Sequence, residues 1–462
     1  MTETKSYFFC GIGGSGMLPL ACIVRARGAE VAGSDRALDQ GRIGDKFAFL
    51  ERRGIRLYPQ DGSGIVSGDQ LLVASAAVED TVPDVVAAKR VGAARITRAE
   101  LLARLFNAAP LSIGVAGTSG KSTVTGMIAW ILHAEGRDPT VMNGAVMKSF
   151  AGPDTPFASA LVGTGDAFVS EVDESDGSIA LYAPTVAVLN NVTLDHKGLD
   201  ELRGLFLGFA TKAKTAIVNL DDPETRSLAA RLPGAIGYSL ADPAADFSAS
   251  AIVEEPLAVS FAVRELGGIP VPVRLQVPGR HNVANALAAL AAARAAGVAL
   301  PEAAAALAGF EGLRRRFEVV GTQSGVAVID DFAHNPDKIA ATLRTLHAFP
   351  GRLLLFFQPH GYGPLRTMGR ELTQTLIEEM ATEDLLIMPD PVYYGGTVER
   401  SVGSGEIVAA VAQGGRRAEH VPDRAAAGRR LAELARPGDR IVVMGARDDT
   451  LPAFAREVMD AL

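Results

Sequence analysis

One stretch of the chain, residues 113–123, constrains its fold more than any other. It reads Ile-Gly-Val-Ala-Gly-Thr-Ser-Gly-Lys-Ser-Thr, an apolar run that ends in a glycine-rich turn, and a helical pattern over 124–133 follows at once. Such a turn directs several backbone N–H groups at one point, to which the start of the helix adds a positive dipole end. Lys121 contributes a full positive charge, and Ser122 a hydroxyl ligand for a phosphate-bound Mg²⁺. The pattern predicts a loop that binds the phosphates of ATP; the alternative is an ordinary turn with a solvated lysine. The expected contacts are Gly117, Thr118, Ser119, Gly120, Lys121, Ser122 and Thr123.

The composition is that of a globular protein with several domains. With 462 residues the chain is too long for one hydrophobic core, and about three domains of ordinary size are expected. Hydrophobic residues make up 48% of it, which is ample core material. A net charge of −8 argues against a nucleic-acid partner bound through a broad basic surface. Because Cys10 and Cys22 are the only cysteines in the sequence, a disulfide framework and a thiolate zinc site are excluded.

The apolar run that follows Lys5 superficially resembles a secretory signal. It contains Gly11, Gly13, Gly14 and Gly16, which suit a nucleotide-binding turn and fit a signal helix poorly. No apolar stretch of about 18 residues lacks both charges and helix breakers. We therefore expect a cytoplasmic protein with no membrane span.

Short apolar strands alternate with helical patterns along most of the chain, which predicts an α/β fold with mostly parallel sheets. We place three α/β domains at 1–107, 108–312 (which contains the phosphate loop) and 313–462. Between about 244 and 277 the pattern changes to short runs of period two, which predicts a small antiparallel addition to the central sheet. The expected strands include 7–12, 30–33, 71–75, 167–172, 185–191, 216–219, 326–329, 353–357, 384–388 and 440–444.

A second glycine motif, Gly-x-Gly-x-x-Gly over 11–16, lies between the first predicted strand and the first predicted helix. Asp35 follows at the end of the next strand, where a carboxylate often holds a ribose hydroxyl. Taken alone, the motif favours a dinucleotide such as NAD. The pyrophosphate of a UDP-sugar would use the same backbone geometry, and the second phosphate loop further along the chain weakens the NAD interpretation.

Acidic residues follow the predicted strand at 167–172. Glu171 is the main candidate ligand for Mg²⁺, and Asp173 and Glu174 are further candidates. Carboxylates at the carboxyl end of a central strand lie beside the phosphate loop in doubly wound folds. His196, in an Asp-His pair after another apolar strand, could ligate a second metal or orient a reacting group. A solvated acidic turn and a surface histidine are the alternatives.

Polar pairs later in the chain also suit nucleotide chemistry. Asn282 and Asn285 share one helix face, so both could contact a planar ligand such as adenine, although Asn282 could instead cap the helix. The arginine run at 314–316 suits a phosphate or a carboxylate, unless it is a solvated face. Two strand ends also carry chemistry-bearing residues. These are Asp330, Asp331 and His334 after one strand, and His360 in Phe-Gln-Pro-His after another.

Taken in order, these motifs resemble those of the ATP-dependent Mur ligases of peptidoglycan synthesis. The order is Gly-x-Gly-x-x-Gly, Gly-Thr-x-Gly-Lys-Ser, Glu-x-Asp-Glu-Ser-Asp, Asp-His, His-Asn-x-x-Asn, Arg-Arg-Arg-Phe-Glu, Asp-Asp-Phe-Ala-His and Phe-Gln-Pro-His. The motifs cover essentially the whole chain and are most similar to the branch that acts on UDP-N-acetylmuramate. The resemblance implies a UDP-sugar domain, a central ATPase domain and a Rossmann-like C-terminal domain.

The resemblance also implies roles for the candidate residues. The catalytic residues would be Lys121, His196, His334 and Arg316. The metal ligands would be Ser122, Glu171 and His196. The adenosine of ATP would contact Asn282, Asn285 and Asp331. The acceptor amine would lie near His334, His360 and Arg366. The UDP-sugar would contact Gly11, Gly13, Gly14, Ser15, Gly16, Asp35 and Ser75.

By the same resemblance, ATP phosphorylates the lactyl carboxylate of UDP-N-acetylmuramate, an amine attacks the acyl phosphate, and phosphate leaves. The expected acceptor is L-alanine, and the alternative is a murein peptide attached in cell-wall recycling. The alternative stays open because Gly-Tyr-Gly-Pro follows His360, where the L-alanine branch normally continues with Arg-Tyr-x-Arg. An NAD-dependent dehydrogenase and a non-enzymatic nucleotide sensor are rival classes. The first leaves the Lys121 loop unexplained, and the second leaves Glu171, His196 and Arg316 unexplained.

Overall fold

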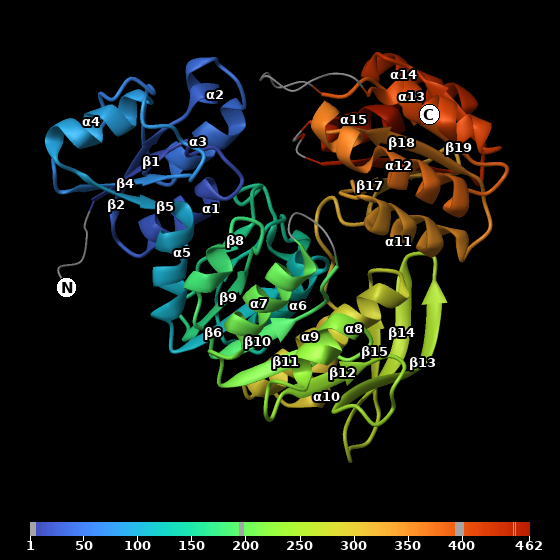
Figure 1. Ribbon diagram of the computed structural model, residues 1–462, viewed down its shortest axis with the longest axis horizontal. Helices are drawn as coiled ribbons and strands as arrows, with labels where there is room; N and C mark the ends of the chain where they lie inside the picture. The colour runs from blue at the N-terminus through green and yellow to red at the C-terminus, as the bar shows by residue number, and fades with distance from the viewer. Residues whose placement is uncertain (1–5, 194–197, 393–401, 447, 449) are drawn as a thin grey trace. The chain divides into compact units, whose positions relative to one another are not determined.

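The computed structural model describes residues 6–193, 198–392, 402–446, 448 and 450–462. Over these residues the strands form three sheets, of five, ten and six strands, with helices packed against them (Figure 1). The chain divides into two compact units. The first holds residues 1–253, 260–276 and 282–311, and the second holds 254–259, 277–281 and 312–462.

The five-stranded sheet at the start of the first unit has the order β3-β2-β1-β4-β5, and all of its pairs are parallel. The strand order reverses between β1 and β4, and open α/β sheets bind ligands at such a reversal. The first glycine motif directly follows β1 and therefore lies at this point. The strands are β1 (Ser6–Cys10), β2 (Glu30–Ser34), β3 (Arg56–Tyr58), β4 (Gln70–Ala74) and β5 (Ala94–Thr97). The helices are α1 (Met17–Ala26), α2 (Arg36–Asp39), α3 (Gly44–Arg52), α4 (Pro83–Val91) and α5 (Arg98–Asn107).

The ten-stranded sheet carries the phosphate loop near its middle. Its order is β15-β14-β13-β12-β11-β10-β6-β9-β7-β8, and β6 pairs in parallel with both β10 and β9. Because β13 and β14 are adjacent and joined by only two residues, they run antiparallel, which confirms the expected addition. The strands are β6 (Leu111–Ala116), β7 (Thr140–Met142), β8 (Ala160–Leu161), β9 (Ala167–Glu171), β10 (Val186–Leu189), β11 (Thr215–Asn219), β12 (Ile236–Ser239), β13 (Phe247–Glu255), β14 (Ala258–Glu265) and β15 (Val271–Leu275). The helices are α6 (Lys121–Ala134), η1 (Lys148–Phe150), η2 (Ser178–Leu181), α7 (Leu199–Ala210), α8 (Pro223–Ala229), α9 (Arg280–Ala295) and α10 (Leu300–Leu307).

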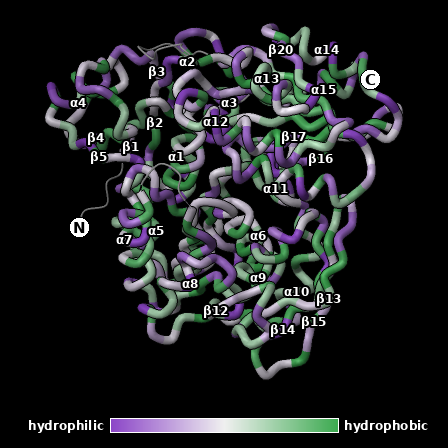
Figure 2. Tube along the Cα trace, turned by 45° about the vertical axis from the view of Figure 1, so that its right-hand side comes forward, coloured by the Kyte–Doolittle hydropathy of each residue, from purple (hydrophilic) through white to green (hydrophobic). Residues whose placement is uncertain are grey.

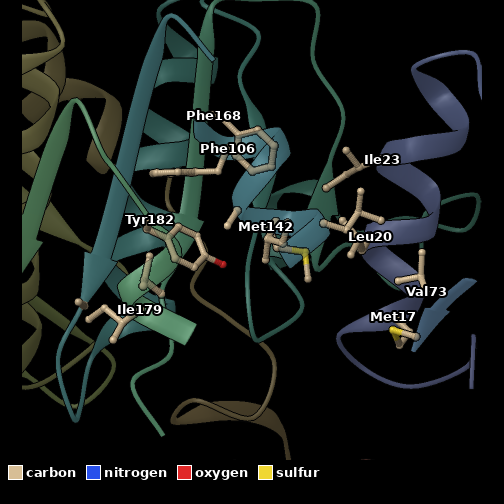
Figure 3. Packing of buried hydrophobic residues seen from close by; sticks show 14 of the residues in the cluster. Met17, Leu20, Ile23, Val73, Phe106, Met142, Phe168, Ile179 and Tyr182 are labelled. Atoms are coloured by element: carbon tan, nitrogen blue, oxygen red, sulfur yellow. The ribbon is translucent and has the colours of Figure 1, made fainter. Parts of the chain in front are cut away.

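The first two sheets share one hydrophobic core. Met17 and Leu20 of α1 belong to the same cluster of buried residues as Phe106 and Phe168 (Figure 3). The rings of Phe106 and Phe168 meet edge to face with their centroids 5.8 Å apart. Apolar surface is thus buried across the junction of the two sheets, which explains why they form one compact unit. The expected boundary after residue 107 lies next to this shared core and stays a prediction.

The six-stranded sheet belongs to the second unit and has the order β16-β17-β21-β18-β19-β20. Only the edge strand β16 is antiparallel to its neighbour; the other pairs are parallel. Strand β18, with the sequence Leu-Leu-Leu-Phe-Phe-Gln, is buried along its whole length, as expected for a central strand covered on both faces. In Figure 2 the tube beside the β17 label is largely green, the colour of hydrophobic residues. The strands are β16 (Glu318–Gln323), β17 (Val326–Asp331), β18 (Leu353–Gln358), β19 (Leu385–Met388), β20 (Arg417–His420) and β21 (Arg440–Gly445). The helices are α11 (Pro336–His347), α12 (Tyr362–Glu379), α13 (Ser404–Gln413), α14 (Arg424–Leu434) and α15 (Leu451–Asp460).

The predicted fold class, three mostly parallel α/β sheets, is confirmed. The first strand ends at Cys10 rather than at residue 12, because Gly11 with φ = +79° turns the chain out of the extended conformation. Helix α6 begins at Lys121 rather than at Val124, because Gly120 with φ = +81° forms its N-cap. Among the described residues, we find no helix with the length and hydropathy needed to cross a bilayer.

Candidate active site

The phosphate loop joins β6 to α6 and is held in place by Asn191. The Asn191 side-chain oxygen accepts hydrogen bonds from the Ser119 backbone N–H at 2.8 Å and from the Thr118 hydroxyl at 2.9 Å. Gly120 is required by space as well as by its φ, since a Cβ there would lie 2.2 Å from the Asn190 amide nitrogen. The sequence between β6 and α6 therefore forms a close-packed loop at the start of a 14-residue helix, as an anion site requires.

Lys121 lies inside this loop and forms a buried ion pair. Its Nζ donates to Glu174 Oε2 at 2.8 Å and to the Gly117 carbonyl at 2.6 Å, and the two charged side chains are only 13% and 5% exposed. Burial alone lowers the pKa of Lys121, but the Glu174 and Glu171 carboxylates outweigh it and raise that pKa above its ordinary value. Lys121 is therefore positively charged at neutral pH and available to an anion.

Ser122 and Glu171 meet beside the same loop. The Ser122 hydroxyl donates to Glu171 Oε2 at 2.7 Å, and the Gly144 backbone N–H donates to the same oxygen at 2.9 Å. A hydroxyl and a carboxylate next to a phosphate site are the oxygen ligands that Mg²⁺ prefers, so these residues fit the predicted metal. His196, the third expected ligand, lies outside the described residues. Within the part of the chain that the structure covers, no cluster of three or more His, Cys, Asp or Glu forms a ready metal site.

The asparagine pair on α9 also lies at the phosphate loop. Asn285 donates to the Asn282 side-chain oxygen at 3.1 Å, so the two amides do share one helix face. Asn285 in turn accepts from Asn190 at 3.1 Å, and Asn190 follows β10. The structure thus brings Lys121, Ser122, Glu171 and the asparagine pair to the carboxyl edge of one sheet.

The first glycine motif forms a tight turn after β1. The Gly11 and Ile12 N–H groups both donate to the Ser34 carbonyl, at 2.8 and 2.9 Å. Asp35, expected at a ribose, has one carboxylate oxygen on the Gly13 N–H at 2.8 Å and the other on the Ala37 N–H, where it caps α2. Asp35 therefore has a structural role in shaping the turn, and its contact with a ligand stays a prediction.

The other residues predicted to contact the UDP-sugar have different surroundings. Gly14 and Ser15 are exposed on the turn, and Gly16 packs closely on Arg98, whose Cδ would lie 3.1 Å from a Cβ at that position. Ser75 follows β4 at the strand-order reversal and accepts a hydrogen bond from the Ala77 N–H at 3.2 Å. Sequence reasoning missed Asp84, which is fully buried and accepts from Ser34 Oγ at 2.5 Å and from the Gly62 N–H at 3.1 Å. No local pattern marks it, because it lies on α4, far along the chain from the turn that it supports.

In the second unit, the arginines of the run at 314–316 do not all make the same kind of contact. Arg315, at φ = +58°, donates to the Gly445 carbonyl at 2.9 Å and to the Asp448 carbonyl at 3.1 Å, so it ties the start of this unit to the residues after β21. Arg316 lies over the ring of Phe332, 4.3 Å from its centroid. Asp331, expected at a ribose, accepts from the Phe317 N–H at 3.1 Å and from the Thr342 hydroxyl.

The histidines expected near the acceptor are neighbours. His334 and His360 meet edge to face with ring centroids 5.5 Å apart. Burial, followed by the nearby Lys338, lowers the pKa of His334 to about 3, so His334 is neutral at physiological pH. Its Nδ1 lies 2.8 Å from the Phe332 carbonyl, which can only accept. Nδ1 therefore carries the ring proton, and Nε2 is left as an acceptor. Arg366 lies in the first turns of α12, which begins at Tyr362, shortly after His360.

Asp330 predicts a specific pH dependence of stability. Its side chain is 1% exposed, and burial raises its pKa from the ordinary 3.8 to about 6, although Arg315 lies 3.4 Å away. The folded state thus binds a proton more tightly than the unfolded state, so this carboxyl stabilises the fold below pH 4 and loses that contribution as the pH rises to about 6. The difference in unfolding free energy between the wild type and Asp330→Asn should fall by about 3 kcal/mol between about pH 3 and about pH 7. Urea unfolding at half-unit pH steps measures it, and parallel curves for the two proteins would contradict the assignment.

Comparison with protein families covers most of the chain. Residues 6–109 match the model described as "Mur ligase family, catalytic domain", residues 115–293 match "Mur ligase middle domain", and residues 315–447 match "Mur ligase, glutamate ligase domain". The three matches follow one another in the order of the three sheets.

Curated relatives match over nearly the full length. The chain is 36% identical over 450 residues to a UDP-N-acetylmuramate–L-alanine ligase of Synechococcus sp. (strain JA-3-3Ab), covering 96% of this chain and 84% of the relative. It is 35% identical over 464 residues to an enzyme of the same name from Sorangium cellulosum, covering 96% and 94%.

Two solved structures have the same fold. A UDP-N-acetylmuramate–alanine ligase from Thermotoga maritima aligns with a TM-score of 0.78 at 24% identity, covering 98% of both chains. A murein peptide ligase from Psychrobacter arcticus aligns with a TM-score of 0.69 at 25% identity, covering 99% of this chain and 98% of the other.

Proposed function

Because this chain belongs to the Mur ligase family, we propose that it is an ATP-dependent ligase that joins UDP-N-acetylmuramate to L-alanine. The observation that carries the proposal is the group at the carboxyl edge of the central sheet, where a charged Lys121 and the Ser122–Glu171 pair meet at one loop. The curated relatives named above support the choice of substrates. The match of 6–109 to the family's own model favours a UDP-sugar over NAD at the first glycine turn.

The first step transfers a phosphoryl group. A carboxylate oxygen of the lactyl group attacks the γ-phosphorus of ATP, the bond to the β,γ-bridging oxygen breaks, and ADP leaves. Such a transfer depends mainly on positioning and on neutralising charge. Lys121 supplies one positive charge at the loop, and Ser122 with Glu171 would hold Mg²⁺, which supplies further charge neutralisation when bound. Glu174 must share Lys121 with the incoming phosphate.

The second step forms the amide. The uncharged amine attacks the acyl carbon, phosphate leaves, and one proton is lost from nitrogen. We assign His334 and His360 to the acceptor. Neutral His334, with Nε2 as an acceptor, suits a hydrogen bond from an amine N–H. The phosphate contact of Arg316, the ribose contact of Asp331, the adenine contacts of Asn282 and Asn285, and the acceptor contact of Arg366 are part of the same proposal.

A panel of acceptors tests the proposal. Phosphate release is measured with ATP, Mg²⁺, UDP-N-acetylmuramate and one of L-alanine, L-serine, glycine or the tripeptide L-Ala-γ-D-Glu-meso-diaminopimelate, and the product is identified by mass. We expect L-alanine to give a kcat/KM at least tenfold above that of the other acceptors. A faster reaction with the tripeptide would instead identify a murein-peptide ligase, the alternative that the departure after His360 leaves open. Phosphate release that no acceptor stimulates would overturn both readings.

A further inference from the structure

A chain of buried hydrogen bonds connects the phosphate loop to the asparagine pair on α9, and of its members the proposal above uses only that pair. It begins at Tyr238 on β12, whose side chain is fully buried and whose hydroxyl donates to Asn190 Oδ1 at 2.6 Å. The Asn190 amide nitrogen then donates to the Ser119 carbonyl at 2.9 Å and to Asn285 Oδ1 at 3.1 Å. The Asn285 amide nitrogen in turn donates a hydrogen bond to the Asn282 side-chain oxygen. We call Tyr238, Asn190, Asn285 and Asn282 the amide relay.

The donors and acceptors of the relay fix the orientation of its side-chain amides. The Ser119 backbone carbonyl only accepts, so the Asn190 nitrogen must face it and the Asn190 oxygen must face Tyr238. The orientation of Asn190 in turn sets that of Asn285, whose oxygen is occupied and whose nitrogen faces Asn282. Asn190 and Asn285 are 4% and 6% exposed, so water cannot easily replace a lost partner.

The relay also shapes the loop itself. A Cβ at Gly120 would lie 2.2 Å from the Asn190 nitrogen and 2.6 Å from the Asn285 oxygen, so both amides lie close against the N-cap residue of α6. Asn219, at the end of β11, adds a bond to the Asn190 carbonyl at 2.9 Å. Asn190 is therefore held by residues of β11 and β12, and it contacts both the phosphate loop and the asparagine pair.

We infer that Asn190, oriented by Tyr238, is a positioning residue for the nucleotide. It fixes the position of the phosphate loop relative to the asparagine pair on α9. The inference rests on the proposed function only in taking ATP as the ligand of this loop. It predicts that weakening the relay lowers nucleotide affinity and leaves the turnover of bound ATP nearly unchanged, since no relay member is assigned to the transferred phosphate.

Tyr238→Phe is the mildest test, because it removes one hydroxyl and keeps the buried ring. We expect the Kd for ADP with Mg²⁺, measured by calorimetry, to rise about tenfold. The KM for ATP should rise by a similar factor, while kcat at saturating ATP stays within about threefold. Tyr182→Phe is the matched control, since Tyr182 is also a buried tyrosine, 3% exposed, but its ring packs in the hydrophobic cluster of Figure 3 and its hydroxyl contacts Ser170 rather than a member of the relay. That variant should bind ADP as the wild type does.

Two variants of Asn190 complete the test. Asn190→Asp keeps the acceptor for Tyr238 but places oxygen against the Ser119 and Asn285 oxygens, so the Kd for ADP should rise about a hundredfold. In an Asn190→Ala background, Tyr238→Phe should add less than a twofold change, because the hydroxyl acts only through Asn190. A purely structural role would lower the melting temperature of Tyr238→Phe with no change in the Kd for ADP. That result, or full additivity in the double variant, would overturn the inference.

The ADP titration separates this inference from the proposed function. A wild-type chain that binds ADP but forms no product with any acceptor would contradict the ligase reaction and leave the relay test valid. Normal ligase activity in the wild type, with equal ADP affinities in Tyr238→Phe and Tyr182→Phe, would contradict the relay alone.

Discussion

Lys121→Ala is expected to lower kcat/KM for ATP on the order of a thousandfold and to leave the fold intact. Lys121 is the buried cation at the phosphate loop, and its charge is worth most where water is excluded and phosphate charge develops. Phosphate release in the presence of UDP-N-acetylmuramate and L-alanine measures the effect. Phosphate release at the parent rate would show that the γ-phosphate of ATP lies elsewhere.

The design must separate lost catalysis from lost stability. Removing Lys121 leaves Glu174 buried without its cation, which can cost about 3–5 kcal/mol. The double variant Lys121→Ala/Glu174→Gln removes both charges and should recover most of the lost melting temperature without recovering activity. Lys89→Ala is the matched control, because Lys89 pairs with Asp80 at 2.7 Å on an exposed surface, and it should retain full activity.

The parts of the site that the sequence predicts are local in the chain. The strand, loop and helix around Lys121 are recognisable because glycine, lysine and serine stand at fixed offsets from an apolar run. Glu171 is predicted for a similar reason, since it ends a strand that must lie in the central sheet. The Ser122 hydroxyl lies 2.7 Å from Glu171 Oε2 because β6 and β9 pair in parallel, which brings the loop after β6 beside the end of β9.

The contacts that the sequence does not predict come from pairings across the fold. Glu174 is foreseeable as an acidic residue near the loop, but its ion pair with Lys121 depends on the path of the chain after β9. Tyr238 stands on the four-residue strand β12, where no motif distinguishes it from an ordinary core tyrosine. Asp35 shows the opposite case: its position after β2 is the one expected for a ribose ligand, yet the structure uses both its oxygens for local backbone N–H groups.

Glu171→Gln should raise the Mg²⁺ concentration for half-maximal activity at least tenfold and lower kcat by about a hundredfold. Glu171 Oε2 accepts from the Ser122 hydroxyl and from the Gly144 N–H, so an amide at this position must either turn its nitrogen away or lose a donor. In either orientation, the site loses the negative charge that a divalent cation requires. Activity measured over a range of Mg²⁺ concentrations tests this expectation.

The way in which the loss of activity depends on Mg²⁺ concentration distinguishes a metal ligand from a residue that only shapes the loop. A ligand variant should recover part of its activity at high Mg²⁺, and MgADP should raise its melting temperature less than that of the wild type. A loop-shaping residue would lower kcat equally at every Mg²⁺ concentration. Glu135→Gln, which removes an exposed carboxylate just after α6, is the control for general charge effects and should match the wild type. An unchanged Mg²⁺ requirement in Glu171→Gln would remove Glu171 from the metal site.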